Sequence, residues 1–161
     1  MNYEQIEILI VDDSDKDTML MERELQKARI ANSIMTLRSG EDALDFLFRR
    51  GAYSGIPQVA LPRVVFLDLR MPGMSGLDVL KQLRLNELTI DLPVVIFTSS
   101  AEDPDISQSY KLGANSYVVK PVSMEQMQIT MRSLGYYWMI VNAVPQKFHS
   151  GFMTNGQQHA K

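Results

Sequence analysis

The chain has 161 residues, of which 45% are apolar and 22% are charged, and its formal net charge is −3. These values are typical of one compact folded domain, and the weak negative charge argues against broad electrostatic binding to nucleic acid. The lack of cysteine excludes disulfide scaffolds and Cys-ligated metal sites, and the lack of a long apolar run or a basic leader predicts a cytoplasmic protein that does not bind membranes.

Five short apolar runs are predicted to form β-strands, and amphipathic segments separate them. The runs are residues 6–11, 33–37, 64–67, 94–97 and 117–119. Continuous apolar runs of this kind favour parallel strands that are covered on both faces. The second run is more polar than the others, so we expect it near an edge of the sheet.

The amphipathic segments carry helix start signals. Four serines each precede an acidic or amide residue by three positions, as in a capping box; the pairs are Ser14 with Asp17, Ser39 with Asp42, Ser75 with Asp78 and Ser123 with Gln126. The remaining helix is expected to start at Asp103, with Pro104 at its first position, and to end near Gly113. Five strand–helix pairs predict a doubly wound α/β fold, (βα)5, with a five-stranded parallel sheet.

Two stretches interrupt this pattern. Residues 50–63 contain two glycines and two prolines and predict an ordered surface excursion, which serves recognition or is a tolerated insertion. Residues 145–161 lose the helical periodicity and are expected to form a mobile tail. The predicted domain is therefore 5–144, followed by a tail that is too short for an output domain.

Polar residues stand where the predicted strands end. They are Asp12 and Asp13 after the first strand, Asp68 after the third, Thr98 at the end of the fourth and Lys120 after the fifth. Ligands of doubly wound sheets bind beyond the carboxyl ends of the strands, so we expect one shared pocket. Three carboxylates there would repel one another by about 4 kcal/mol per pair at ~4 Å and an effective dielectric of 20, so a cation must offset them.

Lys120 supplies one positive charge, and an all-oxygen cluster also suits Mg²⁺ or Mn²⁺. The pattern indicates a phosphoryl-transfer centre in which Asp68, alone on a central strand, is the nucleophile. For any single carboxylate the plainer interpretation is a solvated or capping side chain. The combination on successive strand ends favours the site.

Four segments carry a family resemblance: IVDDSDKD, FLDLRMPGMSGLDVLKQLR, VIFTSS and KLGANSYVVKP. They are similar, in order, to the receiver domain of two-component response regulators, over about residues 5–141. The resemblance implies a flavodoxin-like fold and phosphorelay signal transduction. It also implies that Asp68 accepts a phosphoryl group from the phosphohistidine of a sensor histidine kinase, so that the protein is a phosphoprotein with an aspartyl phosphate.

The resemblance also implies roles for the other residues. Asp13, Asp68 and the backbone oxygen of Arg70 would bind Mg²⁺, with Asp12 holding the ion through water. Lys120 would pair with the acyl phosphate. Its bond to Pro121 would be cis, Thr98 would move toward the phosphate, and Tyr117 would swing inward when Thr98 moves. The side chain of Arg70 either senses the phosphate or is a solvated charge.

The excursion at residues 50–63, the aromatic residues of the last helix and the lack of an output domain resemble a narrower group, the stand-alone regulators paired with cyanobacterial phytochromes. A phytochrome is therefore a candidate for the partner kinase.

The last predicted helix has more apolar surface than one face of a sheet requires. A stripe at helical spacing should face the sheet and comprises Met124, Met127, Met131, Leu134, Trp138 and Val141. Tyr136, Tyr137 and Ile140 lie outside it, and we expect them to form a homodimer interface in the surface of the fourth helix, fifth strand and fifth helix. The alternative is that Tyr137 or Ile140 packs under the tail.

Two other functions remain open. An aspartyl-phosphate phosphatase would use Asp68 as nucleophile, but such enzymes typically carry an acid/base aspartate two residues later, where this chain has Arg70. A flavin-binding module would need a phosphate-binding loop after the first strand, where the acidic DDSDKD would repel the phosphate. We therefore expect a binding switch and not an enzyme.

Overall fold

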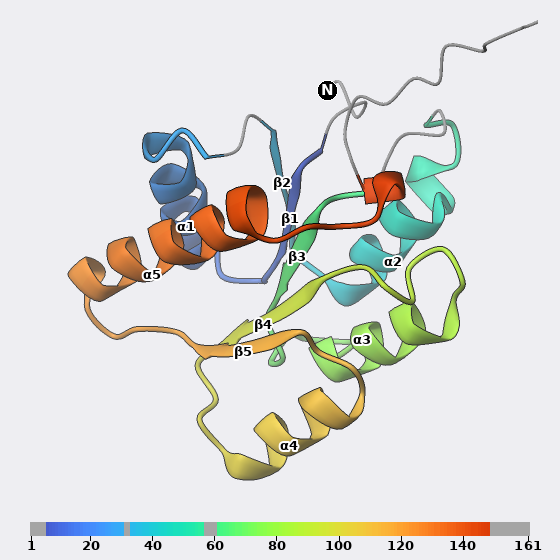
Figure 1. Ribbon diagram of the computed structural model, residues 1–161. Coiled ribbons are helices and arrows are strands. Elements are labelled where there is room, and N and C mark those ends of the chain that lie inside the picture. Colours follow the sequence, from blue (N-terminus) through green and yellow to red (C-terminus); the bar gives the residue numbers. More distant parts are fainter. Residues whose placement is uncertain (1–5, 31–32, 57–60, 149–161) are drawn as a thin grey trace, which may run out of the picture.

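The computed structural model describes residues 6–30, 33–56 and 61–148. Its centre is one parallel sheet with the strand order β2-β1-β3-β4-β5 (Figure 1). The strands are β1 (Ile8–Val11), β2 (Ile34–Leu37), β3 (Val64–Leu67), β4 (Val94–Thr98) and β5 (Ser116–Val119). The doubly wound fold is therefore confirmed, and β2 is an edge strand as its polar composition predicts.

The helices are α1 (Asp15–Lys27), α2 (Gly40–Phe48), α3 (Gly76–Leu85), α4 (Asp103–Lys111) and α5 (Met124–Tyr136). The four predicted serine caps are confirmed, because each serine hydroxyl accepts a hydrogen bond from the backbone N–H three residues later. The helix α4 begins at Asp103 as expected, but its N-cap is Glu102 and Pro104 takes the second position. It ends before Gly113, whose φ of 95° is a left-handed conformation.

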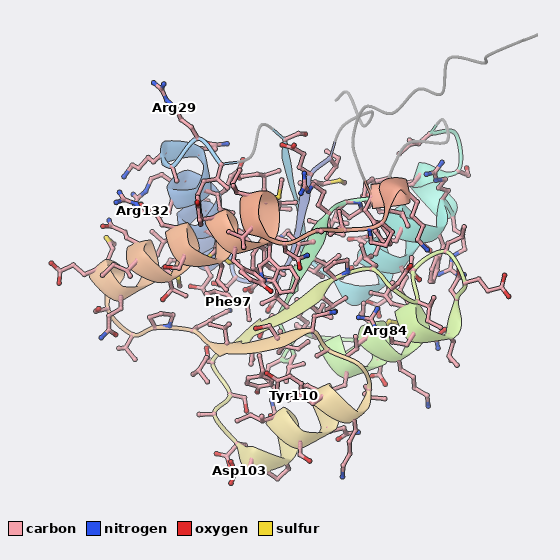
Figure 2. All side chains as sticks on the ribbon, in the orientation of Figure 1. Arg29, Arg84, Phe97, Asp103, Tyr110 and Arg132 are labelled. Carbon is pink, nitrogen blue, oxygen red and sulfur yellow. The ribbon has the colours of Figure 1, made fainter. Side chains whose placement is uncertain are left out.

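Strand side chains alternate between two apolar layers. Ile8 and Ile10 of β1 pack with α1 and α5 on one face, whereas Leu9 and Val11 pack with α2 and α3 on the other. Figure 2 shows Phe97 of β4 between the sheet and α5. The central strands β1, β3 and β4 are buried at every residue, as continuous apolar runs predict, whereas the edge strands β2 and β5 are partly exposed.

The predicted burial of the apolar stripe on the last helix is confirmed for its middle residues and wrong for the residues at both ends. Met127, Met131 and Trp138 are buried, whereas Met124 is 56% exposed and Val141 is 57% exposed. The cause at the far end is a π-helical turn, η3 (Tyr137–Val141), closed by a hydrogen bond from the Asn142 N–H to the Tyr137 carbonyl. The extra residue in this turn shifts the helical period, so that Met139 is buried in place of Val141.

The expected mobile tail begins too early. Residues 142–148 cross from α5 to the opposite layer, and we call them the strap. Val144 and Phe148 are buried there among the side chains of α2 and α3, and residues Gln146–Phe148 form a 3-10 turn. Lys147 Nζ lies 2.5 Å from Asp91 Oδ1. The prediction fails for residues 145–148 because a single buried aromatic side chain after a helix adds no periodic pattern to the sequence. Residues 149–161 lie outside the described part.

The excursion at residues 50–63 lies partly outside the described residues. Its first part is a 3-10 turn, η2 (Gly51–Tyr53), and the Tyr53 ring meets Phe46 of α2 edge to face at a centroid distance of 5.5 Å. This part is therefore ordered as predicted. Among the described residues, no helix combines the length and apolar character needed to cross a bilayer.

Candidate functional site

The carboxyl ends of β1, β3, β4 and β5 bring the predicted polar residues together. Backbone hydrogen bonds continue the sheet just past the strands: Asp12 donates to the Leu37 carbonyl at 3.0 Å, and Asp68 donates to the Val11 carbonyl at 2.9 Å. The Lys120 N–H donates to the Thr98 carbonyl at 2.7 Å. These hydrogen bonds fix the backbone from which the site side chains project. The side chains therefore meet at one edge of the sheet.

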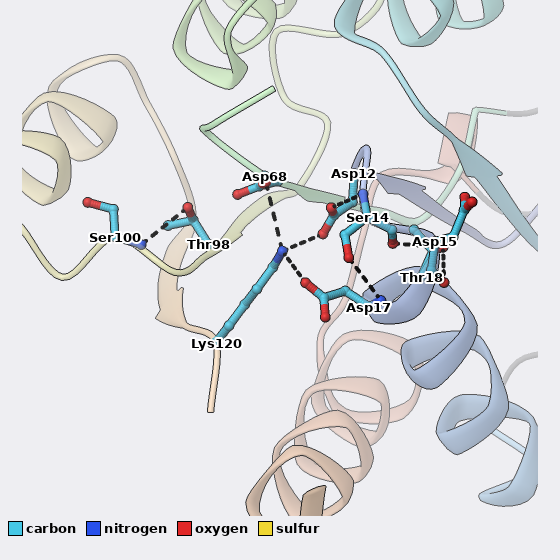
Figure 3. Close-up of polar contacts among 9 residues, drawn as sticks. All are labelled: Asp12, Ser14, Asp15, Asp17, Thr18, Asp68, Thr98, Ser100 and Lys120. Atoms are coloured by element: carbon cyan, nitrogen blue, oxygen red, sulfur yellow. Dashed lines mark hydrogen bonds and ion pairs between the residues drawn. The ribbon is translucent and has the colours of Figure 1, made fainter. Parts of the chain in front are cut away.

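Lys120 is the centre of the site's charge balance. Its ammonium nitrogen lies 2.6 Å from Asp12 Oδ2, 2.9 Å from Asp17 Oδ2 and 3.8 Å from Asp68 Oδ2 (Figure 3). Its side chain is only 8% exposed. Burial alone would lower the pKa of Lys120, but the hydrogen bonds to Asp12 and Asp17 outweigh burial and raise it. Lys120 is therefore held as a cation against the carboxylates.

Asp17 is the site residue that the sequence interpretation missed. The spacing from Ser14 to Asp17 indicates a capping box, and the Asp17 N–H does donate to Ser14 Oγ at 3.3 Å. The carboxylate, however, points to Lys120 across 103 residues of sequence. The cap pattern fixes the backbone of Asp17 in the first turn of α1, and only the folded sheet shows where its side chain reaches.

Asp12, Asp13 and Asp68 form a cluster that could hold a metal ion, since one ligand atom from each lies within 4.8 Å of the others. Burial raises the pKa of Asp12, although its bonds to Lys120 and to the Ser14 N–H oppose the rise. Asp68 Oδ1 is buried and has no hydrogen-bond partner. A buried, unpartnered carboxylate oxygen beside two further carboxylates fits a hard divalent cation.

The β3–α3 loop passes very close to Asp68. A Cβ atom on Gly76 would lie 2.1 Å from the Asp68 carbonyl oxygen, so a side chain at this position has no room. Gly73 has a φ of 78°, which favours glycine. Conformational freedom therefore explains the glycine at position 73, whereas the close approach of the backbone explains the glycine at position 76.

Thr98 and Tyr117 lie on neighbouring strands beside the loop that follows β4. Thr98 is fully buried, and its hydroxyl accepts a 3.4 Å hydrogen bond from the Ser100 N–H. The Tyr117 hydroxyl donates to the Ser100 carbonyl at 3.0 Å. Ser100 therefore joins the two predicted switch residues, a link that the sequence pattern does not reveal.

The prediction of a cis peptide bond between Lys120 and Pro121 is wrong. The described part of the chain contains no cis peptide bond, so this bond is trans in the structure. The free-energy difference between the two forms is only about 0.5–1 kcal/mol before proline, which is too small for the sequence alone to decide.

The arrangement resembles that of known proteins. A sequence model described as the response regulator receiver domain matches residues 8–132. The probable methanogenesis regulatory protein FilR2 of Methanothrix harundinacea is 36% identical over 140 residues, covering 86% of each chain. Response regulator Rcp1 of Synechocystis is 30% identical over 138 residues, covering 86% of this chain and 92% of Rcp1.

Two solved structures have the same fold. The Mn²⁺-bound form of Rcp1 superposes with a TM-score of 0.79 at 29% identity, covering 86% of this chain and 97% of that one. The phosphorylated cyanobacterial phytochrome response regulator RcpA superposes with a TM-score of 0.81 at 26% identity, covering 88% and 99%. The similarity thus includes the segments that carry every strand-end residue of the site.

Proposed function

This chain belongs to the response regulator receiver domain family, and from that membership we propose that Asp68 accepts a phosphoryl group from a sensor histidine kinase. Receiver-domain response regulators act in two-component signalling. The observation that carries the proposal is the state of Asp68: it is buried, and its Oδ1 has no partner, yet it lies beside Lys120 and the Asp12–Asp13 pair. An unpaired carboxylate oxygen in that setting is available as a nucleophile.

We propose that Asp12, Asp13, Asp68 and the backbone carbonyl of Arg70 would hold Mg²⁺ or Mn²⁺. The three clustered carboxylates fit such an ion, and the related Rcp1 has an Mn²⁺-bound form. When bound, the ion neutralises charge on the carboxylates and on the phosphoryl oxygens.

The chain's own residues position the transferred group. In the transfer, an oxygen of Asp68 forms a bond to phosphorus while the bond from phosphorus to the imidazole nitrogen breaks, and the imidazole leaves with that electron pair. Lys120, held near Asp68 by Asp12 and Asp17, pairs with a phosphoryl oxygen. The hydroxyl of Thr98 donates to another oxygen.

The test is phosphorylation by acetyl phosphate in the presence of Mg²⁺, followed by intact mass. We expect the wild type to gain one phosphoryl group, whereas Asp68→Asn gains none. Glu87→Gln is the matched control, because Glu87 is an exposed carboxylate in the loop after α3 and is not one of the site residues. This variant should gain the same mass as the wild type. A wild type that gains no phosphoryl mass would remove the proposal.

The phosphatase alternative makes a different prediction from the same experiment. An enzyme with Asp68 as nucleophile would release inorganic phosphate continuously, whereas a switch stops at one phosphoryl group per chain. Two residues after Asp68 stands Arg70, whose guanidinium is paired with Asp105, and not an acid/base carboxylate. This favours the switch, and a phosphate-release assay over many equivalents of acetyl phosphate separates the two functions.

We further propose that the output surface comprises α4, β5 and α5 and that it binds a second copy of the chain. Tyr136, Tyr137 and Ile140 are 56%, 47% and 60% exposed, so the described part of the tail does not cover them. A shallow groove of about 410 Å³ between β5 and α5 adds apolar surface beside Lys120.

The similarity to RcpA, a phytochrome response regulator, supports a phytochrome as the partner kinase.

A further inference from the structure

We propose that Arg70 and Asp105 form a latch that holds the start of α4 beside the phosphorylation loop, and that a phosphoryl group on Asp68 opens it by attracting Arg70. This inference rests on the proposed phosphorylation of Asp68 and concerns how that event reaches the surface. It assigns a function to an ion pair that the proposed transfer does not use.

The latch is a hydrogen-bonded cluster around one carboxylate oxygen. Asp105 Oδ2 lies 2.6 Å from Arg70 Nη2 and accepts a hydrogen bond from Ser100 Oγ at 2.5 Å. The hydrogen bond from Ser100, together with Arg70, keeps the pKa of Asp105 below its ordinary value. The Ser100 backbone in turn bonds to Thr98 and Tyr117. One oxygen thus connects the β3–α3 loop, the β4–α4 loop and α4.

Few other contacts hold α4. Of its nine residues, all of which the structure describes, only Ser109 is buried. A helix without a wide buried face depends on polar contacts at its ends, and Glu102, its N-cap, provides no side-chain capping bond. The Asp105 cluster therefore provides a large share of what fixes the first turn of α4.

A phosphoryl group would compete with Asp105 for the guanidinium. Arg70 follows Asp68 by two residues, and its side chain is 67% exposed, so that outside its pair with Asp105 it lies largely in solvent. Phosphorylation of a carboxylate adds on the order of one further negative charge and three acceptor oxygens, to which guanidinium groups bind in pairs of hydrogen bonds. Lys120 is already shared between Asp12 and Asp17, so Arg70 is a ready second cation.

Amide hydrogen exchange at Ile106 measures whether the latch is closed, because this N–H makes the first intrahelical bond of α4, to the Glu102 carbonyl at 3.1 Å. We expect exchange in the wild type to become about two- to fivefold faster when acetyl phosphate and Mg²⁺ are present, a factor typical of losing an exposed ion pair. Intact mass gives the phosphoryl occupancy of each sample, and exchange is compared at equal occupancy.

The variants Arg70→Ala and Asp105→Asn should exchange faster before phosphorylation, and phosphorylation should then add little in either. In Asp105→Asn, the Nε resonance of Arg70 should still shift when the phosphoryl group is added. Arg38→Ala removes a similarly exposed arginine, paired with Asp15 at 2.8 Å, and should behave as the wild type. This control shows whether the loss of any exposed arginine is sufficient by itself to speed amide exchange at Ile106.

Each result decides the inference. If phosphoryl mass is gained and Arg70→Ala still shows the same acceleration as the wild type, α4 responds without Arg70 and the latch is wrong, while the proposed function stands. If the wild type gains no phosphoryl mass, the proposed function fails and the latch fails with it. Acceleration in the wild type that both variants lack supports the latch.

Discussion

Lys120 is the residue on which the charge balance of the site depends. Its ammonium group is shared among Asp12, Asp17 and Asp68, but Asp68 is the most distant of the three, at 3.8 Å. Asp68 therefore carries repulsion from its neighbours with little direct compensation. We expect this repulsion to lower the stability of the protein when no cation or phosphoryl group is bound.

The first prediction concerns Asp68→Asn. In EDTA we expect this variant to melt at a higher temperature than the wild type, by about 2–4 °C for each kcal/mol of repulsion removed. The reason is that an amide carries no charge beside Asp12 and Asp13. Added MgCl₂ should raise the melting temperature of the wild type more than that of the variant. A clear drop in EDTA contradicts the picture of clustered carboxylates.

A second prediction concerns pH and Asp105. Its hydrogen bond from Ser100 and its pairing with Arg70 hold its folded-state pKa below the ordinary 3.8. The folded protein therefore gains stability from ionised Asp105 above pH 3.8, and loses it as the pH falls through the lower, folded-state pKa. The stability difference between wild type and Asp105→Asn should be constant near neutral pH and shrink in acid.

Urea unfolding at a series of pH values measures this difference. Asp103→Asn is the control, because Asp103 lies at the tip of α4 and points away from the molecule (Figure 2). If the difference for Asp105 persists unchanged well below pH 3.8, the pairing does not stabilise the fold through its charge.

The strand-end residues were predictable because a parallel sheet brings the ends of its strands together whatever the side chains are. Asp17 and Asp105 were not, since each sits in the first turn of a helix, where an acidic residue has a sufficient local explanation. Their partners Lys120 and Arg70 are 103 and 35 residues away. Long-range pairs of this kind follow from tertiary structure and leave no periodic signal.

At the scale of elements, the last helix and the strap that follows it differ most from the expected pattern. The π-helical turn changes the side-chain period within Tyr137–Val141, and the strap carries Phe148 to the opposite apolar layer. Strands and capped helices were predictable because their signals are local. A single extra residue in a turn, or one aromatic side chain buried beyond a helix, cannot be recognised from periodicity.

The third prediction tests the strap. Phe148→Ala should lower the free energy of unfolding by about 3–5 kcal/mol, because a fully buried aromatic side chain leaves a cavity among the side chains of α2 and α3. Tyr137→Ala, which removes an aromatic side chain that is 47% exposed, should cost much less. Urea unfolding of the two variants gives the comparison. Equal costs would mean that Phe148 is not part of the core.

At the scale of the whole molecule, the site and the strap lie at different ends of the sheet. The carboxylates follow the carboxyl ends of the strands, whereas the strap reaches Asp91, which precedes the amino end of β4. If phosphorylation changes α4 as proposed, we expect the strap to stay in place, because its contact with Asp91 lies at the other end of the sheet.

The fourth prediction concerns assembly. Tyr137→Asp combined with Ile140→Asp should keep the chain monomeric in acetyl phosphate and Mg²⁺, because charged side chains disfavour an apolar interface. The wild type should sediment as a dimer under the same conditions. Leu88→Asp changes a side chain that is 60% exposed in the loop after α3, and it serves as the control that should still dimerise. Dimers of the double variant would place the interface elsewhere.

The burial of Phe148 has a practical consequence. Ile6, which precedes β1, belongs to the same apolar cluster as Phe148, so the first and last described residues are both buried in one layer of the fold. A circularly permuted chain, in which a peptide linker joins these two ends, should therefore keep both side chains in that layer. The backbone could then be reopened beside Leu88, which is 60% exposed in the loop after α3, and a fluorophore attached there would report on the protein without obstructing the acidic pocket.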